Sequence, residues 1–104
     1  MNIKSTARIL SRGVNMNAII TVVGSDKVGI IARVSAYLAE RNINILDISQ
    51  TVLSGNFVMM MVVDLSSGTK ALEEVKKELS EMGDSFNVSI SMMHEKVFSE
   101  MHRI

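Results

Sequence analysis

The nine residues from Phe57 to Leu65, FVMMMVVDL, decide the fold of this chain. Apart from Asp64, every side chain in the stretch is apolar, so a strand formed here would have both faces buried. Turn-forming residues bound it on both sides, SGN at 54–56 before it and SSGT at 66–69 after it. The stretch therefore predicts a central strand of a sheet that is covered on both faces.

Three further strands are predicted on either side of this one. Residues 17–23, NAIITVV, are rich in β-branched side chains, are apolar on both faces and end at Gly24, so they predict a second central strand. Residues 43–53, INILDISQTVL, mix polar with apolar side chains, which is typical of an edge strand. The alternation of apolar residues with serines at 88–92 predicts a second, short edge strand.

Apolar residues at helical spacing occupy the intervals between these strands. Residues 30–41 predict one helix, and Asn42 is its predicted stop. A second helix is opened by residues 66–69, and Gly83 is expected to be its C-terminal glycine. Residues 93–101 predict a short terminal helix, with apolar residues at every fourth position.

The predicted order is therefore β-α-β-β-α-β followed by a terminal helix. This is the split βαβ, ferredoxin-like arrangement of the α+β class, with an antiparallel sheet and helices on one face. Right-handed crossovers place the strands in the spatial order fourth, first, third, second. The composition agrees with this order, because the two strands placed at the centre are those that are apolar on both faces.

Length and charge indicate one domain with a basic extension. The chain has 104 residues, of which 47% are hydrophobic, and its 11 basic and 11 acidic residues cancel. Residues 1–15 contain Lys4, Arg8 and Arg12 and no acidic residue. We expect them to be a flexible basic N-terminal extension before an internal start at Met16, with an amphipathic leader like a transit peptide as the alternative. Residues 17–104 form the single predicted domain.

Composition also excludes several classes of function. The chain has no cysteine, so it has no disulfide scaffold, thiolate metal site or cysteine nucleophile. A balanced charge gives no general attraction to nucleic acid or to an anionic membrane, and the longest apolar run is too short to span a bilayer. We expect a soluble, cytoplasmic protein with no direct nucleic-acid or membrane partner.

No catalytic or metal-binding constellation is evident in the sequence. The two histidines, His94 and His102, are eight residues apart on the predicted terminal helix, a separation of about 12 Å that is too large for one shared ion. Neither lies in a loop that would line a cleft. We therefore expect no catalytic residue, no metal and no cofactor, and the protein is not expected to be an enzyme.

The loop from Gly24 to Gly29 is the most specific local feature. Ser25 or Asp26 is a candidate helix cap, and a helix N-terminus with free N–H groups favours a carboxylate. Asn44 and Asp47, at the start of the following strand, supply an amide and a carboxylate that suit an ammonium group. Both sets together fit a zwitterionic amino acid, although they lie at opposite ends of the helix. An antiparallel second copy, adding its edge strand, would bring them together.

The amino-acid sequence of residues 19–31 and 42–50 resembles that of the ACT domain. The resemblance covers nearly all of residues 17–104, and it extends to small proteins that consist of one ACT domain and to the ACT repeats of the glycine cleavage system transcriptional repressor. It implies a regulatory module that binds an amino acid or a related small molecule at a subunit interface, as a homodimer or higher oligomer, and that acts on a protein target in trans. Carried over by position, the ligand-facing turn is Asp26, Lys27, Val28, Gly29 and Ile30, and the residues facing it from the neighbouring strand are Asn44, Leu46 and Asp47.

Two questions stay open from the sequence alone. The chain can instead be a ligand-free module for oligomerisation or protein interaction, because no catalytic or DNA-binding domain accompanies the ACT pattern. A sheet with helices on one face also leaves its other face uncovered, yet the central strands are apolar on both. The extension at 1–15, the terminal helix or a second subunit is expected to cover that face.

Overall fold

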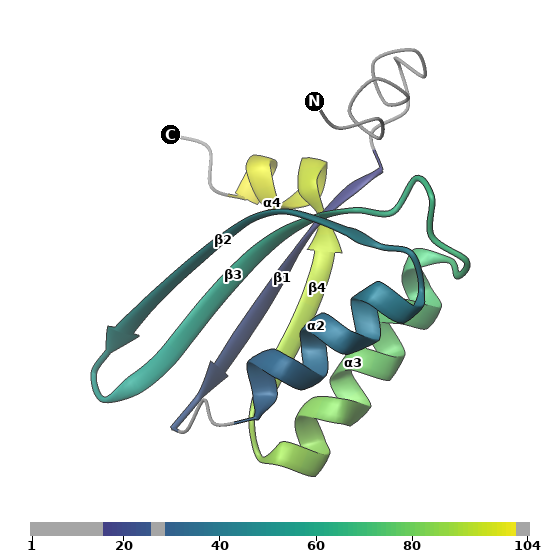
Figure 1. The fold of residues 1–104 in the computed structure, drawn as a ribbon. Helices are drawn as coiled ribbons and strands as arrows, with labels where there is room; N and C mark the ends of the chain where they lie inside the picture. The colour runs from purple at the N-terminus through teal and green to yellow at the C-terminus, as the bar shows by residue number, and fades with distance from the viewer. Residues whose placement is uncertain (1–15, 26–28, 102–104) are drawn as a thin grey trace.

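A computed structural model describes residues 16–25 and 29–101 as one sheet layered with helices (Figure 1). The four strands are all antiparallel and lie in the order β2-β3-β1-β4, as the topology predicts. The elements are β1 (Asn17–Gly24), α2 (Ile30–Glu40), β2 (Asn44–Leu53), β3 (Asn56–Asp64), α3 (Leu72–Phe86), β4 (Ser89–His94) and α4 (Glu95–Met101).

The core lies between one face of the sheet and the pair α2 and α3 (Figure 1). At its centre Ile20 on β1 is paired with Met61 on β3, and both side chains are fully buried. Leu38 from α2 and Leu79 from α3 are also fully buried in this cluster. Each such side chain contributes about 1.5–3 kcal/mol through burial, so the doubly apolar central strands hold the two helices in place.

Helix α4 lies against the opposite face of the sheet, where it contacts β1 and β4. Phe98 of α4 borders a surface that includes Ile19 of β1 and Met60 of β3. At the same end, the Asn17 side-chain amide donates a hydrogen bond to Glu95 Oε1 at 3.4 Å. The terminal helix is therefore a cover for part of the second face, whereas Val23, further along β1, is 36% exposed there.

The ends of the helices differ from the sequence prediction in three places. Helix α3 begins at Leu72 with Ala71 at its N-cap, so residues 66–69 form a turn before the helix and do not open it. Gly29, with φ +80°, occupies the N-cap position of α2 and makes no side-chain cap, so Ser25 is not the cap that we expected. Gly83 is not the C-terminal glycine of α3, because the helix continues to Phe86 and ends at Asn87 in a left-handed conformation. A Cβ on Gly83 would lie 2.7 Å from the Val88 carbonyl oxygen, so this glycine allows β4 to approach the helix.

The boundary between β4 and α4 also falls later than predicted. Met93 and His94 belong to β4, and α4 begins at Glu95. His94 is therefore not on the terminal helix, and its Nδ1 accepts a hydrogen bond from the Lys96 N–H at 3.1 Å. His102 lies outside the described residues. The predicted alternation of buried and exposed residues in β4 is confirmed: Ile90 and Met92 are buried in the core on the helix-covered face, and the serines that alternate with them are exposed.

The hairpin of β2 and β3 closes through a turn of two residues, one fewer than predicted, because Asn56 is the first residue of β3 and is paired with Leu53. Ser54 and Gly55 both have positive φ, 54° and 80°, which is the backbone conformation that matches the twist of a tight hairpin. This end of the hairpin extends beyond the helices (Figure 1). Val52 is 72% exposed and Leu53 is 64% exposed as a result.

Candidate ligand site

Within the described residues, helix α2 starts at Gly29 without a side-chain cap. Gly29 is exposed, and its carbonyl oxygen accepts the Arg33 N–H at 3.0 Å, the first bond of the helix. No acidic side chain occupies the first turn, so the positive end of the helix dipole is not neutralised there by the helix's own residues. Asp26, Lys27 and Val28, which we predict to face the ligand, lie outside the described residues.

The side chain of Ile30, which we predict to face the ligand, lies in the core. Its side chain is 1% exposed and belongs to the core between the sheet and the helices. A buried isoleucine one residue after the left-handed glycine anchors the first turn of α2, so it fixes the direction of the backbone N–H groups there. Ile30 therefore positions the helix start, and of the two described residues of the predicted turn Gly29 is the exposed one.

The start of β2 contains a β-bulge that the sequence pattern does not show. The pairing with β3 shifts between Ile45 and Asp47, so that Leu46 is the extra residue. Asp47 is paired with Val62, which lies on the α4 side of the sheet, whereas Ile45 is paired with the core residue Val63. Asn44 is paired with Asp64, the neighbour of Val63, so its side chain is on the α4 side as well.

Within one chain, the two halves of the predicted site lie at opposite ends of the sheet. Asn44 shares its end of the sheet with Asn17, since both are paired with Asp64. Gly24, which leads into the α2 turn, is paired with Phe57 at the other end. Seven residues of strand separate the ends, a distance of about 23 Å. A single chain therefore does not bring the start of β2 to the start of α2.

The outer edge of β2 has no partner strand within residues 16–25 and 29–101. The strand is paired only with β3 among the described strands, and every residue from Asp47 to Leu53 is exposed. Ile48 at 40% exposure, together with Val52 and Leu53, places large apolar side chains along this edge. A long edge strand with exposed apolar side chains is a surface on which another strand can add.

A hollow of about 200 Å³ lies beneath α4 and was not anticipated from the sequence. It is lined by Ile19, Asp47, Ser49, Met60, Val62 and Phe98. Strict alternation along β2 would place Asp47 on the same face as Ile45, which faces the core. The bulge at Leu46 places Asp47 on the opposite face, the α4 side. This orientation follows from the pairing of Asp47 with Val62 and could not be predicted from the sequence.

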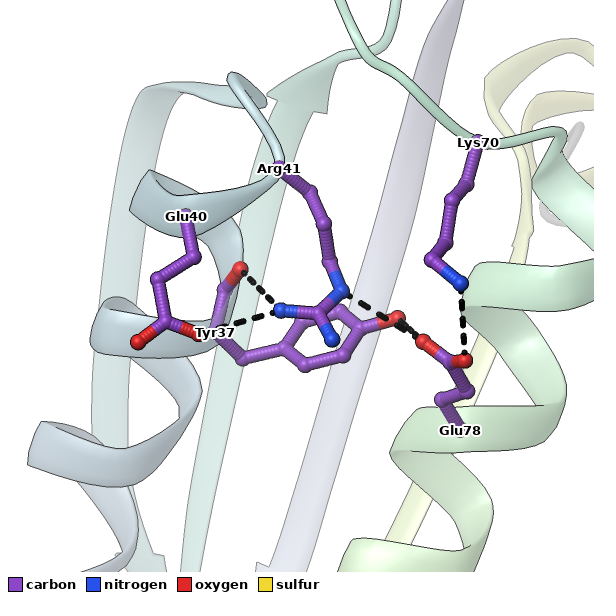
Figure 2. A network of polar contacts seen from close by, with 5 residues as sticks. All are labelled: Tyr37, Glu40, Arg41, Lys70 and Glu78. Atoms are coloured by element: carbon purple, nitrogen blue, oxygen red, sulfur yellow. Dashed lines mark hydrogen bonds and ion pairs between the residues drawn. The ribbon is translucent and has the colours of Figure 1, made fainter.

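A polar network joins α2 to α3 on the other side of the molecule (Figure 2). The Tyr37 hydroxyl donates a hydrogen bond to Glu78 Oε1, and Lys70 Nζ lies 3.1 Å from Glu78 Oε2. The Arg41 guanidinium stacks over the Tyr37 ring with Cζ 3.8 Å from its centre. Arg41 Nε is 3.4 Å from Glu78 Oε1, which is an ion pair without hydrogen-bond geometry.

The network shifts two pKa values in opposite directions. Burial, and then the hydrogen bond to Glu78, raises the pKa of Tyr37 above its usual 10.0. The hydrogen bond from Tyr37, followed by the one from Lys70, lowers the pKa of Glu78 below its usual 4.5. Both shifts favour a neutral Tyr37 phenol beside an ionised Glu78 carboxylate, which is the pair of states that forms the hydrogen bond. This hydrogen bond links α2 to α3. The sequence gives no sign of it, because Tyr37 and Glu78 are 41 residues apart.

The part of the chain that the structure describes contains neither a metal-binding cluster nor a membrane-spanning helix. No three His, Cys, Asp or Glu side chains in residues 16–25 and 29–101 lie close enough to hold a metal ion. Among the described helices, none is long and apolar enough to cross a membrane.

The fold, the open edge of β2 and the glycine turn before α2 define an ACT domain. A family model described as "ACT domain" matches residues 17–93, and the chain belongs to this family. It is 53% identical to a UPF0237 protein of Clostridium acetobutylicum over 89 residues, which are 86% of this chain and all of that protein. A UPF0237 protein of Listeria innocua is 49% identical over the same lengths.

Solved structures agree with this assignment. An ACT domain protein from Streptococcus pneumoniae is 45% identical, with a TM-score of 0.72 over 82% of this chain and 96% of that one. A protein described as a glycine cleavage system transcriptional repressor is 16% identical, with a TM-score of 0.64 over 82% of this chain and 51% of that one. At that identity the second likeness concerns the fold alone.

Proposed function

We propose that this chain is a small regulatory ACT-domain protein that binds an amino acid or a related small ligand between two copies and acts on a protein target in trans. The observation that carries the proposal is the open edge of β2, exposed from Asp47 to Leu53. Membership of the ACT family supports a module that binds a small ligand.

Antiparallel pairing of two β2 strands would complete the site. The start of β2 lies at the Asn17 end of the sheet, and its last residue, Leu53, lies at the end where β1 leads into α2. In an antiparallel pair, Asn44 of one copy would lie beside Leu53 of the other. Each copy thereby brings the start of its β2 to the α2 turn of its partner, and the two-fold symmetry creates two equal sites.

The two halves have complementary chemistry for a zwitterion. The N–H groups at the start of α2, with the predicted turn from Asp26 to Ile30, suit the ligand's carboxylate. The amide of Asn44 and the backbone around Leu46 come from the other copy and suit the ammonium group and the side chain. Asp47 faces α4, so its carboxylate would approach such a ligand from that side of the sheet. In this role the protein is a binding module and not a catalyst.

Sedimentation and calorimetry together test the proposal. We expect the chain to sediment as a dimer at micromolar concentration and at least one common amino acid to release or absorb heat on titration. Val52→Lys combined with Leu53→Lys would place two like charges on each edge, so dimerisation and ligand binding should be lost together. Val97→Lys, at an exposed apolar position on α4, is the matched control and should change neither. A monomer that binds no amino acid contradicts the proposal.

The alternative is a ligand-free oligomerisation or interaction module. The exposed Val52 and Leu53 favour it, because an apolar edge suffices for assembly without a ligand. A stable dimer that gives no heat and no thermal shift with any amino acid would select this alternative.

A further inference from the structure

Strand β4 forms the edge of the sheet opposite β2, and within residues 16–25 and 29–101 it is paired only with β1. Just before this strand, the Val88 N–H donates to the Gly83 carbonyl oxygen of α3 at 2.9 Å, so the main-chain groups of Val88 point away from β1. Such groups alternate in direction along a strand, so those of Ile90 and Met92 also point away from β1. The Ile90 nitrogen agrees, because it lies 3.2 Å from the position of a Cβ on Gly83. The sheet therefore has a second edge to which a strand can add.

A hollow of about 390 Å³ lies beside this edge, between the second half of α3 and the start of β4. It is lined by Val88 and Ile90 and by four exposed polar residues, Ser80, Asp84, Asn87 and Ser89. None of these four side chains makes a hydrogen bond or an ion pair with another described residue. The hollow therefore offers a carboxylate, an amide and two hydroxyls to a ligand that brings hydrogen-bond donors and a positive charge.

We infer that the protein target adds an extended segment to the edge of β4 and places an arginine side chain of that segment in this hollow. The inference rests on the proposed function, because two paired copies occupy each other's β2 edges and leave only the two β4 edges for a target. Ile90 points into the core on the helix side of the sheet. In an added strand the residue opposite Ile90 points to the same side, which is where the α3 residues Ser80 and Asp84 line the hollow.

The size and the charge of the hollow both favour arginine at this position. The atoms of an arginine side chain occupy roughly 200 Å³ at about 30 Å³ each, so the side chain enters the hollow together with water. Its planar guanidinium brings five N–H donors, which suit the Asp84 carboxylate and the oxygens of Ser80 and Asn87. An acidic side chain would be repelled by Asp84. A large apolar side chain would displace water from the polar groups without replacing its hydrogen bonds.

Amide NMR of the intact chain tests this inference with the peptide Ac-TVRVT-NH2 as the probe. Titration should shift the signals of Ile90, Met92 and Asp84 saturably at millimolar peptide and leave those of Ser49 and Thr51, on β2, in place. The peptide with glutamate instead of arginine should bind at least tenfold more weakly. A methyl group on the main-chain nitrogen of the arginine should abolish binding, because the Ile90 carbonyl then has no donor in the added strand.

Variants separate the charge of the hollow from the strand edge. Asp84→Asn removes the charge and keeps the shape of an exposed side chain, so it should weaken binding of the arginine peptide about fivefold. Glu73→Gln, an exposed carboxylate in the first turn of the same helix, is the matched control and should leave the affinity unchanged. Equal binding of the arginine and glutamate peptides, unchanged binding by Asp84→Asn, or shifts confined to β2 would each overturn the inference.

Sedimentation distinguishes failure of this inference from failure of the proposed function. The chain should remain a dimer with and without the peptide, since the peptide takes the β4 edge and the second copy takes the β2 edge. A monomer that shows the peptide shifts at Ile90 and Met92 would contradict the proposed dimer and support binding at β4. Dimers that assemble further without peptide, and that lose the peptide shifts as they do so, would show that another copy of this chain takes the β4 edge and would overturn the inference.

Discussion

Tyr37 and Glu78 are 41 residues apart in the sequence, and a hydrogen bond between them joins helices α2 and α3. The phenol of Tyr37, on α2, donates to the carboxylate of Glu78, on α3, and Arg41 and Lys70 bring two cations to the same carboxylate (Figure 2). Glu78 is one-third exposed, so water screens the ion pairs. The hydrogen bond from the largely buried Tyr37 is therefore the part of the network with the greatest effect on stability.

Tyr37→Phe should destabilise the protein by about 1 kcal/mol, because it removes one hydrogen bond to a charged group and retains the packing of the ring. Urea unfolding followed by circular dichroism measures this change as a lower midpoint. Lys77→Ala, at an exposed position on the same helix as Glu78, is the control and should stay within about 0.5 kcal/mol of the parent. An unchanged midpoint for Tyr37→Phe would show that the hydrogen bond contributes nothing.

The depressed pKa of Glu78 predicts a loss of stability in acid. The folded state binds fewer protons at this carboxylate than the unfolded state, so its contribution is complete above the usual pKa of 4.5 and disappears as the pH falls through the lower, folded value. Unfolding midpoints measured from pH 6 to pH 2 should decline less steeply for Glu78→Gln than for the parent. Parallel pH profiles for the two proteins would refute the assignment.

Gly83→Ala should destabilise the protein by about 1–3 kcal/mol although alanine is the better helix former. The new Cβ would lie 2.7 Å from the Val88 carbonyl oxygen and 3.2 Å from the Ile90 N, which are backbone atoms that cannot move without displacing β4. Ser80→Ala, on the exposed side of the same helix, should be neutral or slightly stabilising. Thermal unfolding of the two variants gives the comparison, and equal Tm values would contradict it.

Gly29→Ala should cost about 1–2 kcal/mol, because φ at this position is +80° and a Cβ is strained there. Space is not the reason, since among the described residues the nearest approach to such a Cβ would be Phe86 Cε2 at 3.8 Å, an ordinary contact distance. Gly29→Asn should cost less, as asparagine tolerates the left-handed conformation. Chemical unfolding of both variants tests this order, and a more stable alanine variant would show that the turn is not strained.

The central strands were predictable because their composition leaves few alternatives. The doubly apolar stretches at 17–23 and 57–65 must lie inside a sheet covered on both faces, and the strand order follows from crossover handedness. The role of Gly83 was not predictable, because a glycine near a helix end has the same sequence signature as one that admits a neighbouring strand.

The candidate site was predictable only in part. The sequence shows that the start of α2 and the start of β2 are far apart in one chain, and the strand pairing agrees. It does not show that Asp47 faces α4, because one extra residue at Leu46 shifts the alternation. Contacts that span long sequence separations, such as Tyr37 with Glu78, leave no periodic signal.

The bulge at Leu46 also determines how β2 tolerates changes in length. Because Leu46 is the surplus residue opposite β3, its deletion would leave Ile45 and Asp47 on the faces they already occupy. Deletion of any single residue between Asp47 and Leu53 would instead reverse the sides of the residues that precede or follow it. Position 46 is thus the one place in the first half of β2 where related chains can lose a residue and keep both surfaces of the strand intact.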